Sequence, residues 1–294
     1  MGFTVSRWET DRGVHEIATR EARGAATGLV RRYAGYSERA EDSRRREVAR
    51  PGIALILGLG DPLAVSYEET GGATAFGAFV VGNHTRPAWT GFSGRQHGVQ
   101  VDLTPAGAYA LLGDAIDDLT DRVVPLDAVL GREGIELLEC LAESPSWSAR
   151  FGLLDHVIGD HRDRPPLSRE VRWLWQQLAA CHGDARVETL LGEVGWSRRH
   201  LARRFRQQIG LAPKAYARLL RFQHLVDCLQ SRPSGSSLAD IAVAAGYYDQ
   251  AHLNRDFRAF AGCTPTQYLS ESDPDPQVRF VQDDEREALI GSPS

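Results

Sequence analysis

Two stretches of the chain, 198–209 and 250–261, carry long polar side chains at helical spacing beside a stripe of apolar ones. Apolar residues that recur every third or fourth position define one face of a helix, and that face must meet a core. The apolar members are Leu201, Phe205 and Ile209 in the first stretch and Leu253, Phe257 and Phe260 in the second. The members that face away are Arg199, Ala202, Arg203 and Arg206 in the first stretch and Gln250, Ala251, Asn254, Arg255 and Arg258 in the second.

The side chains on the outer faces have the chemistry needed to recognise base pairs. Arginine can donate to O6 and N7 of guanine together, and asparagine or glutamine can pair with N6 and N7 of adenine. The small Ala202 and Ala251 permit close approach or contact with a thymine methyl group. A single arginine-rich face is more often only solvated, but two such faces on a duplicated element favour contact with DNA.

The two stretches belong to a repeated element. "GWSRRHLARRFRQQIGLAP" and "GYYDQAHLNRDFRAFAGCTP" both present glycine, an aromatic residue, His-Leu, arginine, phenylalanine, glycine and proline in the same order. Each follows a short helical segment that ends at glycine, which is the outline of a helix-turn-helix. Ser197 and Asp249 are the predicted N-caps of the second helices, and a long helix is predicted to start at Pro213.

The segment from 168 to 270 resembles the DNA-binding domain of the AraC/XylS family of bacterial transcription regulators. The resemblance rests on "GWSRRHLARRFRQQIGLAPKAY" and "LADIAVAAGYYDQAHLNRDFRAFAGCTPTQY" and covers about a third of the chain. It implies seven helices with two helix-turn-helix units, joined by a rigid helix over 213–230. It also implies base contacts at Arg199, Ala202 and Arg203 in the first unit, and at Gln250, Ala251 and Arg255 in the second. Packing or phosphate contact is expected for His200 and His252. The whole predicted DNA-binding set is Arg198, Arg199, Ala202, Arg203, Arg206, Gln250, Ala251, Asn254, Arg255 and Arg258.

Charge is distributed unevenly along the 294 residues, whose net charge is −5. Residues 1–165 carry a net −6, residues 166–270 a net +6, and residues 271–294 a net −5. A basic segment between two acidic ones indicates that this segment meets a polyanion, in agreement with the motifs it contains.

The fold predicted for the whole chain is α+β with two domains. Short β-rich runs broken by glycine and proline, such as "GIALILGL" and "AFGAFVVGN", predict a cupin-like barrel or sandwich followed by helices. "VDLTPAGAYALLG" and "VPLDAVLG" resemble a subgroup of AraC-like regulators whose sensing domain has no assigned ligand. The predicted divisions are a charged lead-in over 1–50, a sensing or dimerising domain over 51–160, a linker over 161–167, the all-α DNA-binding domain over 168–270 and an acidic disordered tail over 271–294.

The sequence offers no arrangement of residues that would support catalysis or bind a metal. His84 and His97 lie 13 positions apart with no paired histidines, unlike the ligands of a metal-dependent cupin. No Ser-His-Asp or Cys-His arrangement is identified, and Cys140 lies in the apolar helical stretch "LLECLAE". We therefore predict no enzyme activity, no cofactor and no metal.

The expected function is that of a DNA-binding regulator, with a small-molecule effector bound by the N-terminal half. Two alternatives stay open: a regulator without a ligand, whose first half only dimerises or binds another protein, and a DNA-modifying enzyme fused to this domain. The expected partners are double-stranded DNA, the effector, RNA polymerase as for an activator, and a second copy of the chain. For that copy, the helices over 132–161 could form a seam from Leu137, Leu141, Leu154 and Ile158, or pack only on their own sheet. With no apolar run long enough to span a bilayer, the expected location is the cytoplasm, on the nucleoid when bound to DNA.

Overall fold

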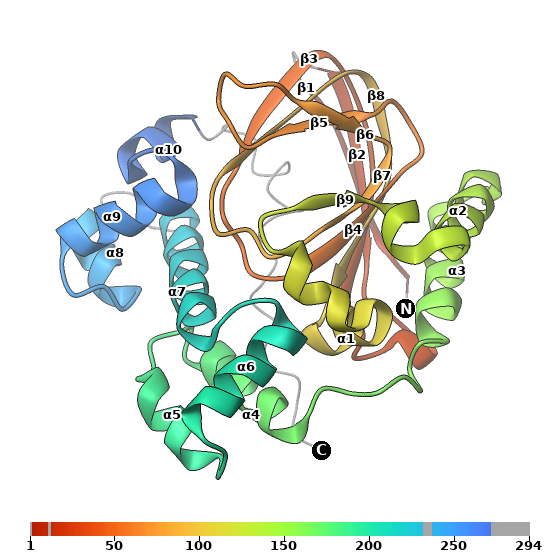
Figure 1. Cartoon of the computed structure of the whole chain (residues 1–294). Coiled ribbons are helices and arrows are strands. Elements are labelled where there is room, and N and C mark those ends of the chain that lie inside the picture. Colours follow the sequence, from red (N-terminus) through yellow and green to blue (C-terminus); the bar gives the residue numbers. More distant parts are fainter. Residues whose placement is uncertain (1, 11–12, 232–236, 272–294) are drawn as a thin grey trace.

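The structure is a computed structural model, and it describes residues 2–10, 13–231 and 237–271. The first half of the chain forms one antiparallel sheet with strand order β1-β2-β3-β8-β4-β7-β9, in which β5 pairs with β6 and β8. Figure 1 shows the sheet curling into a barrel. The strands are β1 Thr4–Thr10, β2 Gly13–Arg20, β3 Val30–Glu47, β4 Ile53–Gly58, β5 Leu63–Ser66, β6 Thr74–Phe76, β7 Ala78–Val81, β8 Ala88–Leu103 and β9 Val123–Pro125.

The long strands β3 and β8 form the central pair of the sheet. They pair from Val30 opposite Leu103 to Glu47 opposite Ala88, with a register shift between Ala40 and Ser43. Such a shift bends a strand and increases its twist, which lets the pair wrap around the barrel. The apolar face at the lower end of the barrel builds the N-terminal core. Its fully buried members include Tyr33, Leu55, Leu57, Val99 and Val101.

Residues 1–50 are not the lead-in that we expected, because β1, β2 and β3 occupy most of this segment. Their charged residues form ion pairs with one another. Arg7 stands opposite Glu16 on the neighbouring strand and forms an ion pair with it, and Arg45 forms an ion pair with Glu38 of the same strand, β3. One face of these strands meets solvent and the other includes polar residues, so the sequence lacks the apolar alternation that marks a half-buried strand.

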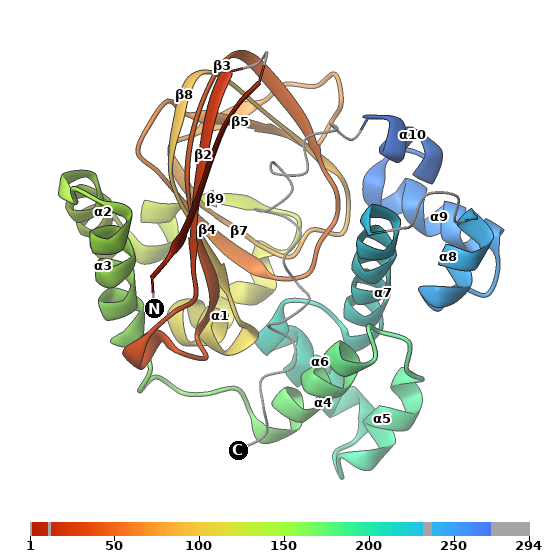
Figure 2. The same cartoon turned by 180° about the vertical axis from the view of Figure 1, so that it is seen from behind.

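Helices follow the sheet directly. They are α1 Pro105–Leu112, the 3-10 helix η2 Gly113–Leu119, α2 Leu126–Glu143 and α3 Trp147–Gly159, while a further 3-10 helix, η1 Gly24–Ala26, lies between β2 and β3. Thr104 caps α1, its Oγ1 accepting from the backbone N–H of Gly107 at 3.0 Å. In both views α2 and α3 lie on the side of the barrel away from the C-terminal helices (Figures 1 and 2).

The apolar stripes of α2 and α3 pack within their own chain. Leu137, Leu141, Leu154 and Ile158 are between 0% and 5% exposed and belong to the core beneath the sheet. Of the two arrangements left open for these four residues, the structure shows packing within the chain, and a seam between two chains built from them is wrong. Ile135, at 47% exposed, is the large apolar side chain that α2 leaves on the surface.

The segment predicted as a linker, 161–167, is anchored near both of its ends. The imidazole Nε2 of His161 lies 2.8 Å from Oε1 of Glu133, and His161 is buried. Leu167 is 2% exposed and belongs to the core of the C-terminal helices. The domain boundaries themselves stay predictions.

The rest of the described chain is helical and built around α7. Among the described residues it contains seven helices: α4 Arg169–Ala180, α5 Val187–Glu193, α6 Arg198–Ile209, α7 Pro213–Gln230, α8 Leu238–Ala244, α9 Gln250–Ala261 and α10 Pro265–Glu271. Figure 1 shows α7 standing between α4–α6 and α8–α10. The predicted tail lies outside the described residues beyond 271. No helix in the described ranges combines the length and apolarity needed to cross a lipid bilayer.

Candidate nucleic-acid interface

The two repeats of the sequence form two helix-turn-helix units with matching backbone geometry, α5–α6 and α8–α9. Gly195 and Gly246 take φ of +73° and +75° in the two turns, a left-handed conformation that glycine adopts at little cost. The predicted N-caps are confirmed. Ser197 Oγ accepts from the N–H of His200 at 3.3 Å, and Asp249 Oδ1 accepts from the N–H of His252 at 2.6 Å. The two copies of the repeat therefore have the same turn and the same cap.

Aromatic contacts are duplicated as well. The ring of His200 stands edge-on against Trp196 with centroids 4.6 Å apart, and His252 stands in the same way against Tyr247 at 5.0 Å. Packing, one of the two roles expected for these histidines, is therefore present in both units. The element continues beyond each helix with a second edge-on pair, Phe205–Tyr216 at 5.8 Å and Phe257–Tyr268 at 5.5 Å.

The predicted division of α6 and α9 into two faces is confirmed. The six apolar residues of the inner faces are at most 4% exposed. None of the ten predicted DNA-binding residues is buried. Ala202 and Asn254 are half-buried, and the other eight are exposed. Both helices therefore present an accessible polar face, and the assignment of these side chains to DNA stays a prediction.

Arg206 is notable among the ten because its partner lies in the N-terminal half of the chain. Its Nε donates to Oδ1 of Asp117, in η2 of the N-terminal half, at 2.7 Å. This hydrogen bond and the charge of Asp117 raise the pKa of the Arg206 guanidinium. The last turn of α6 thus contacts the N-terminal half.

The N-terminal half also binds the carboxyl end of α6, through what we call the first clamp, Asn83 and Thr120. The last carbonyl groups of a helix have no partner within the helix. Here Asn83 Nδ2 donates to the carbonyl of Ile209 and Thr120 Oγ1 to that of Gly210, each at 2.7 Å. Asn83 is 2% exposed, so its hydrogen bond to Ile209 lies out of solvent.

A second clamp, formed by Arg46 and Ala49, binds the carboxyl end of α9. The backbone N–H of Ala49 donates to the carbonyl of Phe260 at 2.8 Å, and Arg46 Nη1 donates to that of Ala261 at 3.3 Å. Ala49 is fully buried among the C-terminal helices. The two clamps therefore hold equivalent points of the repeat, the last turn of each second helix.

Sequence reasoning missed the clamp residues and one residue of the second unit. Nothing in the sequence around Asn83 or Ala49 indicates a partner more than a hundred residues away. Tyr248, by contrast, could have been found, because His252 follows Gly246 by six positions whereas His200 follows Gly195 by five. The additional residue is Tyr248, which is 92% exposed just before the cap of α9.

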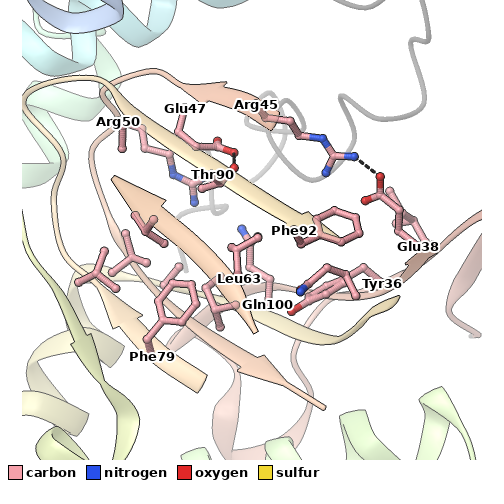
Figure 3. Close-up of a pocket in the computed structure, with 18 of the residues that line it drawn as sticks. Tyr36, Glu38, Arg45, Glu47, Arg50, Leu63, Phe79, Thr90, Phe92 and Gln100 are labelled. Atoms are coloured by element: carbon pink, nitrogen blue, oxygen red, sulfur yellow. Dashed lines mark hydrogen bonds and ion pairs between the residues drawn. The ribbon is translucent and has the colours of Figure 1, made fainter. Parts of the chain in front are cut away.

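The barrel contains a cavity of about 230 Å³. Every strand except β6 contributes to its lining, and most of the lining is apolar. Figure 3 shows Leu63 and Phe79 along one side, with Glu47, Arg50 and Thr90 on the other. A preformed apolar cavity with a few polar groups is the usual form of a small-molecule site.

The charged groups at the cavity wall are partnered by the protein. Arg50 Nη2 lies 3.0 Å from Oδ1 of Asp102, and Arg32 Nη2 lies 3.0 Å from Oδ2 of the same carboxylate. Burial alone would raise the pKa of Asp102, but these two guanidinium groups lower it below its ordinary value. The further pairs are Glu38 with Arg45, Glu47 with Thr90 Oγ1 at 3.0 Å, and Glu16 with Trp147 Nε1 at 2.9 Å.

Two polar atoms of the lining have no hydrogen-bond partner among the described residues, Nε1 of Trp8 and Nε2 of His84. His84 is 6% exposed. Burial, and then the charge of Arg50, lower the pKa of His84 to about 4, so its ring is neutral at neutral pH. Within the described residues, no cluster of histidine, cysteine, aspartate and glutamate could hold a metal ion.

Comparison with known proteins places the helical part of the chain. Residues 190–271 match the family described as "Helix-turn-helix domain". The HTH-type transcriptional regulator MtrA of Neisseria gonorrhoeae is 28% identical over 85 residues, which are 29% of this chain and 28% of MtrA. The probable transcription factor PqrA of Proteus vulgaris is 30% identical over 98 residues, which are 33% of this chain and 78% of PqrA. A structure of ToxT from Vibrio cholerae aligns with a TM-score of 0.45 at 8% identity, over 85% of this chain and 99% of that one.

The extent of these matches differs between the relatives. The chain spans less than a third of the length of MtrA, whereas its match takes in most of PqrA. Both relatives are named as transcription regulators or factors, and the residues that match the family, 190–271, carry both capped second helices. The chain belongs to the AraC-type family of helix-turn-helix transcription regulators.

Proposed function

We propose that the chain regulates transcription by placing the first turns of α6 and α9 in adjacent segments of the major groove. The observation that supports this most directly is the duplication itself: the same turn, cap and exposed polar face occur twice, on either side of α7. In helix-turn-helix proteins the N-terminal residues of the second helix contact base edges. Two such helices on one support would contact the same face of the duplex about one turn apart.

Within this proposal the polar faces have separate tasks. Arg199 and Arg203 read guanine from α6, while Gln250 and Asn254 suit adenine on α9. Ala202 and Ala251 are too short to form hydrogen bonds with bases, so the steps beneath them are read loosely or through DNA shape. Arg198, the first residue of α6, contacts a phosphate together with the free N–H groups of that helix N-terminus, while Arg258, in the last turn of α9, contacts a phosphate through its side chain alone.

We further propose that a small molecule bound in the barrel controls this activity. The support is the cavity of about 230 Å³, with two polar atoms in its lining that have no hydrogen-bond partner among the described residues. The other reading, in which the N-terminal half only holds the two units in place, needs no cavity.

The proposed place of action is the bacterial cytoplasm, where the chromosome lies. A second copy of the chain would have to use surface residues of α2 and α3 such as Ile135.

The DNA contacts can be tested by gel-shift titration of Arg203→Ala and Arg255→Ala against an operator selected from a random duplex pool. Each variant is expected to lose roughly 1–3 kcal/mol of specific binding. Arg172→Ala is the matched control, because Arg172 is an exposed arginine of the same basic segment on α4, away from both polar faces. Unchanged affinity of both variants, with circular dichroism like that of the wild type, would refute the placement of these helices in the groove.

A further inference from the structure

The cavity wall and the two clamps share a backbone connection. Arg50 and His84 exchange two backbone hydrogen bonds, N–H to carbonyl in each direction, both 3.1 Å long. Both residues line the cavity. Residue 83, next to His84, forms the first clamp, and residue 49, next to Arg50, forms the second. One residue pair thus touches the cavity on one side and leads to both second helices on the other.

The first clamp follows His84 directly. Asn83 Oδ1 accepts from the N–H of Gly52 at 2.9 Å, while its Nδ2 donates to the carbonyl of Ile209. The side chain is therefore fixed at both polar ends, and it cannot follow a shift of the 83–84 backbone without pulling on the end of α6. A Cβ built on Gly210 would lie 2.9 Å from Asn83 Nδ2 and 3.0 Å from Cγ2 of Ile116, so this contact is already tight.

The second clamp follows Arg50 in the other direction along the chain. Glu47, Val48 and Arg50 line the barrel cavity, and the same three residues line a small cleft against α7 and α10. Ala49, between them, turns away from the cavity and bonds to α9. The segment 47–50 therefore contacts both the barrel interior and the C-terminal helices.

The lining also restricts the class of ligand. Each charged group at the wall already has a protein partner, so a charged ligand would be desolvated without an opposite charge to compensate it. The unsatisfied atoms, Nε1 of Trp8 and Nε2 of the neutral His84, suit an uncharged hydrogen-bonding group. An apolar cavity of 150 Å³ holds benzene, so 230 Å³ corresponds to roughly nine or ten non-hydrogen atoms.

We propose that the barrel binds an uncharged, mostly apolar molecule of this size that hydrogen-bonds to His84, and that the Arg50–His84 bridge passes its presence to both clamps at once. The inference rests on the proposed effector response and names its ligand class and its route. A ligand shifts the arrangement only by its different affinity for the two states, and the bridge is the element whose position both sites depend on.

The ligand class is tested on the full chain with three probes of nearly equal size: benzyl alcohol, benzoate and benzylammonium. Benzyl alcohol at millimolar concentration is expected to raise the melting temperature, and the two ions are not. His84→Leu should lower the affinity for benzyl alcohol about tenfold, while the melting temperature of the free protein should stay nearly the same. A larger shift with either ion, or no shift with any probe, would overturn the proposal. It would leave the DNA contacts of Arg203 and Arg255 untouched, so the two failures are distinguishable.

The route is tested by hydrogen exchange of the same protein with and without benzyl alcohol. The amides of Ala49, Gly210 and Gly262 report on the clamps, because they bond to Phe260, Arg206 and Arg258 respectively. Protection of all three is expected to change by several fold, while the amides of α2 serve as a control on the far side of the barrel. In Asn83→Ala the change at Gly210 should disappear and that at Ala49 and Gly262 should remain. A change confined to the barrel, or loss at both clamps in this variant, would contradict the route.

Discussion

The ion pair between Arg206 and Asp117 gives a quantitative prediction about DNA binding. Arg206 belongs to the predicted DNA-binding face of α6, yet its Nε is held 2.7 Å from Oδ1 of Asp117. Asp117→Asn removes the charge that holds it while preserving the size of the side chain. We expect the released guanidinium to reach a phosphate, so the variant should bind DNA more tightly at low salt.

The size of the effect follows from counting one additional phosphate contact. Each contact on double-stranded DNA changes the slope of log affinity against log salt concentration by about −0.9. Between about 50 and 200 mM salt, the variant should therefore lose roughly 3.5-fold more affinity than the wild type. Fluorescence anisotropy with a non-specific duplex measures this slope, and no operator is needed.

Two variants separate this explanation from a general change of charge. Asp118→Asn alters the net charge equally, but Asp118 is exposed, and in the described part of the chain the carboxylate that bonds to Arg206 is that of Asp117. Its slope should match that of the wild type. Adding Arg206→Ala to Asp117→Asn should abolish the steeper slope. If Asp118→Asn steepens the slope as much as Asp117→Asn does, or if the double variant retains the effect, the reasoning is refuted.

Three further predictions concern stability. Asn83→Ala removes two hydrogen bonds of a buried amide, so the free energy of unfolding measured in urea should fall by about 2–4 kcal/mol, against about 1 kcal/mol for Thr120→Val, which removes one. Gly210→Ala should lower the melting temperature more than Gly195→Ala, since both glycines have positive φ but only at Gly210 would a Cβ meet other atoms within 4 Å. The pKa of His84 is about 6.5 in the unfolded chain and about 4 in the folded protein. The free energy of unfolding should therefore decrease by about 3 kcal/mol as the pH falls from about 6.5 to about 4, and His84→Gln should remove this part of the pH dependence.

Each of these has an outcome that would contradict it. Equal losses for Asn83→Ala and Thr120→Val would mean that solvent satisfies the broken bonds of the first clamp. Equal losses for the two glycine variants would mean that the crowding at Gly210 is relieved at no cost. An unchanged pH dependence in His84→Gln would place the titrating group elsewhere.

The helical half could be predicted from sequence because its determinants are local. Ser197 and Asp249 are residues that favour the N-cap position, so they predict where the two helices begin. The spacing of Leu201, Phe205 and Ile209 predicts which face of the helix is buried. These rules need only a few neighbouring residues, so they hold wherever the element lies in the chain. The repeat added an internal check, since each copy predicts the other.

The N-terminal strands and the clamps could not be predicted because their determinants are distant. Arg7 and Arg45 look like residues of a solvated segment until Glu16 and Glu38 are placed beside them. Asn83 and Thr120 have polar side chains typical of any turn. Their partners are backbone carbonyl groups, which every residue has, so the residue types do not indicate these hydrogen bonds. Likewise, the burial of Leu137 and Leu141 in their own chain depends on how far the sheet extends.

The clamps hold the carboxyl ends of α6 and α9, whereas the residues predicted to read bases cluster toward the amino ends. Recognition and control are thus assigned to different parts of the same two helices. If the proposed base contacts hold, substitutions at Arg199 or Gln250 would change the preferred operator without disturbing the contacts made by Asn83 or Ala49. Arg206 is the exception, since it lies on the predicted DNA-binding face and contacts the N-terminal half. Apart from that residue, the proposed operator contacts and the proposed effector response would depend on separate residues of this chain.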